Sequence, residues 1–180
     1  YLKSGGFITE FKKTRELEKI KADFCGAQEV SIFPNGTITL YSILKQLNIG
    51  VGDKVIVPNY TMAATAFAVK EVGAEVIFCD IEWPSLCISK TNIEEIIDKE
   101  RGNISALMFM SANGRYPSYE MDEIIQICKS NDIYLIEDSA QALGSYYRDG
   151  SHIGTKGIAG SISFSMPKIK VLAQFEFVCQ

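Results

Sequence analysis

The sequence predicts an α/β fold in which helices flank a mainly parallel sheet. Short apolar runs alternate along the chain with amphipathic segments of about ten residues. This alternation is typical of βαβ units, in which each helix returns the chain to the start of a neighbouring parallel strand. With 180 residues, 47% of them apolar, the chain can bury one core, and neither a repeat nor a linker divides it. We therefore expect one α/β domain.

Each expected element has a local signal. Strands are expected where compact apolar runs meet turn residues, at 30–33, 53–57, 74–79, 106–110, 133–137 and 160–165. Helices are expected where apolar residues recur at helical spacing, at 7–24, 38–47, 61–72, from 91 onward and at 119–130. Asn35 or Thr37 would cap the second helix, and Thr91 with Glu94 has the form of a capping box.

Composition and charge argue against several functions. The formal charge of −4 and the lack of a basic cluster speak against nucleic-acid binding. No apolar run reaches the length of a membrane span, and no signal peptide opens the chain. The five cysteines form no CxxC pair and His152 is the one histidine, so no metal site is expected. We expect His152 to lie on the surface. Scattered free thiols suit a reducing cytoplasm, where we place the protein.

The segment 134–144 contains the first candidate functional group. An apolar run ends there in Glu137 and Asp138, and a loop of small residues follows. A buried strand of an open α/β sheet has this form when it delivers a carboxylate to its carboxyl edge, where ligands bind in this class. A strand that ends in a solvated, charged turn has the same form. The spacing by itself does not separate the two interpretations.

Two further segments have the chemistry of a binding site. At 34–37, a glycine and a hydroxyl stand between an expected strand and the start of an expected helix, whose unpaired N–H groups suit a phosphate. An ordinary turn fits the same residues, which form neither a GxGxxG nor a Walker A pattern. Lys168 follows the last expected strand, five residues after Ser163. A buried lysine there would be a Schiff-base nucleophile, whereas most lysines are only solvated.

Four motifs follow one another along the chain. They are Asn35-Gly-Thr37, Val57-Pro-Asn-Tyr-Thr-Met62, Glu137-Asp-Ser-Ala-Gln-Ala-Leu-Gly144 and Ser163-Phe-Ser-Met-Pro-Lys168. In this order and spacing they resemble the nucleotide-sugar aminotransferases of the DegT/StrS type, and the similarity runs from about residue 5 to Lys168. These are fold-type-I enzymes that depend on pyridoxal phosphate. The resemblance thus implies a large domain like that of aspartate aminotransferase and pyridoxal 5'-phosphate as the cofactor.

The resemblance assigns roles to three residues that would act on the reacting part of the cofactor. Lys168 would be the catalytic residue: it would form a Schiff base with the cofactor and then move the proton between the amino donor and the cofactor. Asp138 would pair with the pyridine nitrogen and keep it protonated, which makes the ring an electron sink. Gln141 would lie near the phenolic oxygen. Without the resemblance, the alternatives are a helix cap at Asp138 and a surface amide at Gln141.

Four further residues would hold the rest of the cofactor. The resemblance places the amide groups of Gly36 and Thr37, with the hydroxyl of Ser163, around the phosphate. Met62 stands where the family usually has an aromatic side chain against the cofactor ring, and a thioether also packs on a π-face. The alternatives are a core methionine at Met62 and a plain strand residue at Ser163.

The chain departs from the family pattern after Lys168. Relatives continue with a glycine-rich loop, further strands and a small C-terminal domain, whereas 169–180 contains no Gly-Gly pair. We therefore expect 1–168 to be the pyridoxal-phosphate-binding large domain, as the N-terminal part of the family fold. The segment 169–180 would be a tail outside the family pattern, and the small domain would be absent. The large domain would then be incomplete.

The resemblance implies an enzyme that transfers an amino group, with glutamate as donor, to a keto-sugar attached to a nucleotide. The product would be an amino sugar for polysaccharide or glycan synthesis. Because active sites in this family are built at a subunit interface, a homodimer is the expected assembly. The alternative is a catalytically inert remnant that at most binds pyridoxal phosphate or a partner subunit.

Overall fold

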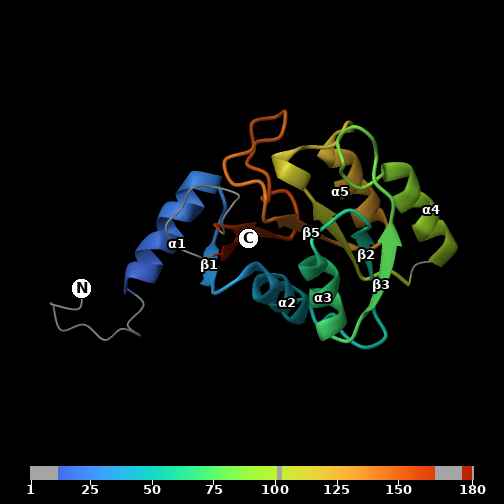
Figure 1. Ribbon diagram of the computed structural model, residues 1–180, viewed down its shortest axis with the longest axis horizontal. Coiled ribbons are helices and arrows are strands. Elements are labelled where there is room, and N and C mark those ends of the chain that lie inside the picture. The colour runs from blue at the N-terminus through green and yellow to red at the C-terminus, as the bar shows by residue number, and fades with distance from the viewer. Residues whose placement is uncertain (1–11, 101–102, 165–175, 180) are drawn as a thin grey trace.

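The computed structural model describes residues 12–100, 103–164 and 176–179, which form a sheet with helices on both faces (Figure 1). The helices are α1 (Lys12–Cys25), α2 (Gly36–Gln46), α3 (Ala63–Glu71), α4 (Lys90–Glu100), the short 3₁₀ turn η2 (Ala112–Gly114) and α5 (Met121–Ser130). The strands are β1 (Val30–Phe33), β2 (Lys54–Pro58), β3 (Glu75–Cys79), β4 (Ala106–Met110), β5 (Tyr134–Ser139), β6 (Ala159–Ser163) and β7 (Glu176–Cys179). Every strand and helix expected from the sequence is present; the strands at 30–33 and 106–110 have the predicted bounds, and the bounds of the others differ. The start of the helix expected at 7–24 lies outside the described residues.

The seven strands follow the order β1-β7-β6-β5-β4-β2-β3. The pairs β2–β3, β2–β4, β4–β5 and β5–β6 are parallel, so the prediction of a mainly parallel sheet is confirmed. The carboxyl ends of these strands lie at one edge of the sheet, which is where open α/β sheets bind their ligands.

Strand β7 lies between β1 and β6 and runs antiparallel to both. The sequence predicted no strand in 169–180, so Glu176–Cys179 is an element that the sequence analysis missed. Since β7 opposes both neighbours, β1 runs in the same direction as β6. The turn from β1 into α2 therefore lies at the same edge of the sheet as the ends of β4, β5 and β6.

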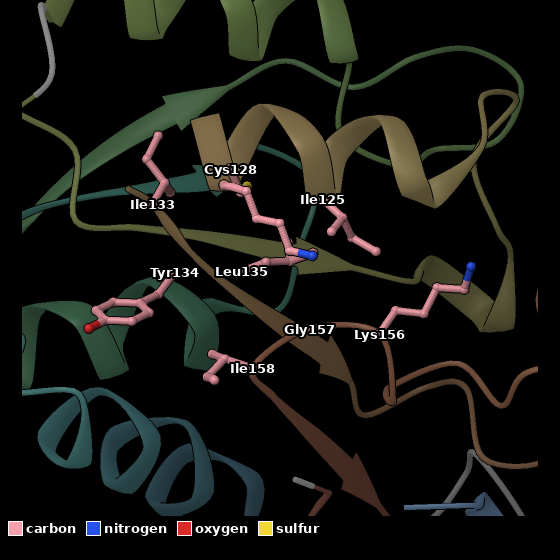
Figure 2. Close-up of a pocket in the computed structure, with 9 residues that line it drawn as sticks. Ile125, Cys128, Ile133, Tyr134, Leu135, Lys156, Gly157 and Ile158 are labelled. Carbon is pink, nitrogen blue, oxygen red and sulfur yellow. The ribbon is translucent and has the colours of Figure 1, made fainter. Parts of the chain in front are cut away.

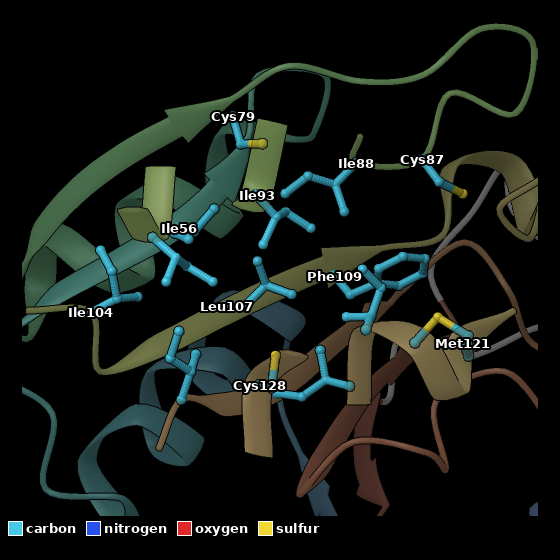
Figure 3. Packing of buried hydrophobic residues seen from close by; sticks show 14 of the residues in the cluster. Ile56, Cys79, Cys87, Ile88, Ile93, Ile104, Leu107, Phe109, Met121 and Cys128 are labelled. Atoms are coloured by element: carbon cyan, nitrogen blue, oxygen red, sulfur yellow. The ribbon is translucent and has the colours of Figure 1, made fainter. Parts of the chain in front are cut away.

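The central strands bury both faces, and their alternating side chains divide between two cores. One core packs α4 and α5 against side chains such as Ile56, Leu107 and Leu135 (Figure 3). The other packs α2 and α3 against Val55, Ile136 and other residues on the opposite face. This arrangement explains why the central strands read as continuous apolar runs in the sequence.

Alternation also separates the two adjacent acids of β5. Glu137 shares a face with Leu135, toward α4 and α5, whereas Asp138 shares the face of Ile136, toward α2 and α3. One strand end thus places two carboxylates in two different environments.

Among the described helices, none combines the length and the apolar character needed to cross a membrane.

The helix caps match the sequence predictions in one case and differ in another. Asn35 caps α2, and its side-chain oxygen accepts a hydrogen bond from the Ile38 N–H at 3.0 Å. The predicted capping box at Thr91 is wrong, because α4 begins at Lys90 and the hydroxyl of Ser89 accepts the N–H of Asn92 at 3.4 Å. Serine is a strong N-cap residue, and the nearer Ser-x-x-Asn pattern starts this helix.

Candidate functional site

Five of the predicted cofactor-binding residues line one pocket at the carboxyl edge of the sheet. They are Gly36, Thr37, Met62, Asp138 and Gln141. The pocket has a volume of about 140 Å³, and its remaining lining residues are Asn35, Leu40, Ala64, Met110 and Ala140. These residues come from the β1–α2 turn, the start of α3, the end of β4 and the loop after β5. The fold thus brings together segments that are far apart in the sequence.

The start of α2 forms the anion-binding wall of this pocket. Asn35 accepts the N–H of Ile38 with its side chain and the N–H of Thr39 with its carbonyl oxygen, at 3.0 and 3.1 Å. The N–H groups of Gly36 and Thr37 remain as the first-turn donors, and both residues line the pocket. Helix N-termini attract anions through these donors and through the helix dipole. This wall therefore has the chemistry of a phosphate site.

Asp138 supplies the negative group of the pocket. Only 3% of this residue is exposed, although it lines the pocket. Its Oδ2 accepts the hydroxyl hydrogen of Thr65 at 2.6 Å, and its Oδ1 accepts the N–H of Ala140 at 3.3 Å. A carboxylate held in this way, with so little water around it, interacts strongly with a cationic nitrogen. The interpretation of 134–144 as a strand that ends in a solvated, charged turn is therefore wrong.

Gln141 reaches the pocket from the loop after β5. Its side-chain oxygen accepts the N–H of Asn113 at 2.8 Å, so its NH₂ group is the donor it offers to a ligand. Asn113 belongs to the turn η2, which packs closely on the segment 141–145. At Gly114, with φ of +71°, a Cβ atom would lie 2.4 Å from the hydroxyl oxygen of Ser145. This close approach fixes the turn, and the turn fixes Gln141.

The other two predicted site residues are not placed in the pocket. Ser163 ends β6 with 1% of its surface exposed, and it is not among the residues that line the pocket. Lys168 lies outside the described residues, five positions beyond the end of β6. Their roles remain predictions.

Glu137 is a buried acid whose role the sequence did not reveal. Its Oε1 accepts the N–H groups of Lys156 and Gly157, both at 2.6 Å. Its Oε2 accepts the Tyr147 hydroxyl at 2.5 Å and the N–H of Gly154 at 2.9 Å. Burial raises the pKa of the Glu137 carboxyl, and these four donors oppose the rise. Glu137 thereby anchors the loop that leads into β6. The glycines at 154 and 157, ahead of a strand, were the signal for such a close approach.

His152 is buried, so the prediction that it lies on the surface is wrong. It is 2% exposed, and its ring meets those of Phe24 and Tyr146 edge to face. Nε2 accepts the N–H of Gly144 at 2.9 Å, and Nδ1 lies 2.6 Å from the carbonyl oxygen of Ile153. These contacts suit the neutral ring protonated on Nδ1. His152 therefore holds the end of the 139–144 loop, which also contains Gln141.

Stability is expected to fall as the pH drops below about 6.5, because burial lowers the pKa of His152. Between the folded-state pKa and the ordinary value of 6.5, the unfolded chain binds a proton that the folded chain does not, which favours unfolding. Urea unfolding between pH 5.5 and 7.5 measures this. His152→Gln, whose amide keeps one donor and one acceptor, should flatten the dependence. His152 is the sole histidine. If the free energy of unfolding of this variant depends on pH as steeply as that of the unmodified chain, groups other than histidine cause the dependence.

A second pocket, of about 300 Å³, lies away from the pocket around Asp138 (Figure 2). It is lined by α5, by the start of β5 and by 156–158, with apolar side chains such as Ile125, Leu135 and Ile158. Because Tyr134 opens β5, this pocket belongs to the amino end of the strand, whereas Asp138 lies near the other end. None of the predicted site residues lines it. The pocket around Asp138 is the candidate active site.

Comparison with curated proteins finds similar proteins that include a perosamine synthase and an aminotransferase. Over 165 residues the chain is 33% identical to a GDP-perosamine synthase from Caulobacter vibrioides, an alignment that covers 92% of this chain and 41% of the relative. It is 32% identical over 173 residues to an L-glutamine:2-deoxy-scyllo-inosose aminotransferase from Streptomyces fradiae, covering 96% of this chain and 39% of the relative. The chain thus spans about two fifths of the length of the curated relatives it matches.

Comparison with solved structures also finds an aminotransferase. The pyridoxal-phosphate form of a putative sugar aminotransferase from Streptococcus pneumoniae matches with a TM-score of 0.86 and 27% identity. The match covers 97% of this chain and 47% of that protein. The sequence profile of the DegT/DnrJ/EryC1/StrS aminotransferases, which depend on pyridoxal phosphate, matches residues 1–176, including part of 169–180. The chain therefore belongs to the DegT/DnrJ/EryC1/StrS aminotransferase family.

Proposed function

We propose that this chain forms the cofactor-binding part of an enzyme that transfers an amino group to a keto-sugar attached to a nucleotide. One observation carries the proposal: residues from separate loops, predicted to bind pyridoxal phosphate, line a single pocket. That pocket has a helix N-terminus on one wall and the buried carboxylate of Asp138 on another. The donor set fits a ligand with an anionic phosphate and a basic ring nitrogen.

The residues of the pocket divide the work of holding the cofactor. The amides of Gly36 and Thr37 would bind the phosphate, and Asp138 would pair with the protonated ring nitrogen. The NH₂ group of Gln141 would donate to the phenolic oxygen, and Met62 would pack on the ring. Bound in this way, pyridoxal phosphate supplies the electron sink for amino-group transfer. Lys168 would carry the cofactor covalently and move the proton, and Ser163 would add a hydroxyl to the phosphate site.

The names of two relatives bear on the proposed substrate class. A GDP-perosamine synthase is among them, which supports a nucleotide-linked sugar as the acceptor. The Streptomyces fradiae relative is named for L-glutamine and for 2-deoxy-scyllo-inosose. We propose glutamate as the donor here, and an amino sugar for polysaccharide or glycan synthesis as the product. A reaction that requires glutamine and does not proceed with glutamate would show that the assignment of the donor is wrong.

Assembly, location and domain limits complete the proposal. A groove of about 560 Å³ beside the pocket is lined by Thr37, Ile38, Tyr41, Phe67 and Glu71, and Phe67 is 60% exposed. This apolar surface on α2 and α3 supports a homodimer in which a second copy covers it. Four buried free cysteines, among the described residues, support a cytoplasmic location. We propose 1–168 as the large domain that binds the cofactor.

One alternative has an observation in its favour. The residues of this chain align with about two fifths of the length of the curated relatives. A polypeptide limited to these residues would be an inert remnant that binds pyridoxal phosphate or a partner subunit without catalysing transfer. Cofactor binding is common to both functions, and the reaction with an amino donor separates them.

A visible absorption spectrum tests the proposal. Pyridoxal phosphate is added to the chain and to its Lys168→Ala variant, and the excess is removed. We expect a visible band that requires Lys168 and that bleaches when glutamate is added, because a covalently bound cofactor then accepts the amino group. A band that glutamate leaves unchanged would favour the inert remnant. If Lys168→Ala shows the same band as the unmodified chain, the assignment of Lys168 is wrong.

A further inference from the structure

Two threonines form a chain of hydroxyl groups behind the pocket. The hydroxyl of Thr65, in the first turn of α3, lies 2.6 Å from Oδ2 of Asp138. The hydroxyl of Thr61 lies 2.7 Å from that of Thr65. Thr65 is fully buried and does not line the pocket, so it reaches any ligand only through Asp138.

The direction of both hydrogen bonds follows from the carboxylate. An ionised carboxylate only accepts hydrogen bonds, so the hydrogen of Thr65 points to Asp138. The oxygen of Thr65 is then available to accept the hydrogen of Thr61. Hydrogen bonds in a chain polarise one another, and a bond to a charged acceptor is stronger than one between neutral groups. Both hydroxyls therefore stabilise the charge on Asp138.

The contact is more than the ordinary start of a helix. The N–H of Thr65 already bonds to the carbonyl oxygen of Met62 at 3.0 Å, which satisfies the backbone of this turn. A threonine hydroxyl in a helix commonly bonds to a carbonyl of the preceding turn. Here it spans 73 positions of sequence and joins α3 to β5. A buried hydroxyl that bonds to the one acid in the pocket wall orients that acid.

We propose that Thr65, supported by Thr61, is a positioning residue that sets the orientation and the ionised state of Asp138 toward a ring nitrogen. The inference rests on the proposed function, because it needs pyridoxal phosphate in the pocket to affect the reaction. With Asp138 ionised, the proton between the two groups resides on the ring nitrogen. Without the Thr65 hydroxyl, the carboxylate loses a hydrogen bond of 2.6 Å and is held less firmly.

Equilibrium dialysis of pyridoxal phosphate against Thr65 variants tests this. Thr65→Val keeps the shape and removes the hydroxyl, and we expect the dissociation constant to rise roughly tenfold, as for loss of one hydrogen bond to a charged group. Thr65→Ser restores the hydroxyl and should stay within about threefold. Thr61→Val should give a smaller rise. Thr155→Val is the matched control, since its hydroxyl donates to the backbone carbonyl of His152 at 2.8 Å, outside the pocket.

A second measurement reads Asp138 directly and needs no cofactor. Carbon-13 NMR of the Asp138 carboxyl should show titration at higher pH in Thr65→Val than in Thr65→Ser or Thr155→Val. A purely structural role would lower the unfolding midpoint without this selective change. Identical titration and identical affinity in Thr65→Val and the unmodified chain would overturn the inference.

The outcomes separate the inference from the proposed function. If the unmodified chain binds no pyridoxal phosphate, the proposed function fails, and the NMR titration alone decides whether Thr65 controls Asp138. If the cofactor binds but Thr65→Val behaves like Thr155→Val in both measurements, the proposed function stands and the inference is wrong. Should Thr65→Val fail to fold, Thr61→Val takes its place, because Thr61 is only half-buried and bonds to the same chain of hydroxyls.

Discussion

Asp138→Asn is expected to weaken the binding of pyridoxal phosphate by about 100-fold, which corresponds to loss of a charged hydrogen bond in a buried site. Asparagine keeps the size of the side chain, so the pocket and the contact to Thr65 survive in shape. The negative charge that pairs with a protonated ring nitrogen is lost. In a site with so little water, no solvent dipoles replace that charge. Absorption titration with pyridoxal phosphate measures the change.

Asp80 offers a matched control for this substitution. It follows β3 at the same edge of the sheet, but it is exposed and bonds to the side chain of Asn59 at 2.9 Å, outside the pocket. Asp80→Asn should leave the affinity within about twofold, because a solvated charge is screened. Asp138→Asn binding within threefold of the unmodified chain would remove Asp138 from the cofactor site.

Glu137→Gln is expected to lower the free energy of unfolding by about 3 kcal/mol, because it breaks a buried, hydrogen-bonded charge network. The carboxylate accepts four hydrogen bonds, two at each oxygen. An amide has one oxygen, so its NH₂ group would face two of these donors. The Tyr147 hydroxyl can turn to accept from it, but the backbone N–H groups cannot. Urea unfolding at neutral pH measures the loss.

Glu120→Gln is the control for loss of a carboxylate. The Glu120 side chain is 61% exposed and pairs with Arg148 at 2.8 Å on the surface, where an ion pair contributes little. Glu120 is also the N-cap residue of α5, but glutamine keeps a side-chain oxygen that can accept the N3 N–H, so the free energy of unfolding should change by less than about 0.5 kcal/mol. An equally small change in Glu137→Gln would show that the loop before β6 does not depend on Glu137.

The sequence was sufficient to predict the parallel core of the sheet, because each strand and helix there has its own characteristic spacing of apolar residues. Strands buried on both faces read as apolar runs, and amphipathic spacing marked the helices between them. The antiparallel β7 had no such signal. Its position depends on backbone hydrogen bonds to β1 and β6, strands from the two ends of the described chain, and these partners exist only after the sheet has formed.

At the candidate site, too, some residues were predicted from the sequence, whereas the contacts of others were visible only in the structure. Gly36, Thr37, Met62, Asp138 and Gln141 were predicted from the family resemblance, which short motifs of neighbouring residues carry, and all five line the pocket. The sequence analysis assigned no role to Glu137, and it placed His152 on the surface. Only packing showed that Glu137 meets the 154–157 loop and that His152 is enclosed by aromatic rings.

The sequence by itself therefore determined the fold class and the family, and it predicted five residues that line one pocket. The tertiary structure showed what surrounds each of the two adjacent acids: Asp138 lines the pocket, Glu137 does not, and Thr65 and Ala140 hold Asp138 there. The physical reason is that a strand sends successive side chains to opposite faces. What each face meets, whether the hydroxyl of Thr65 or the N–H groups of the loop before β6, comes from chain segments distant in sequence.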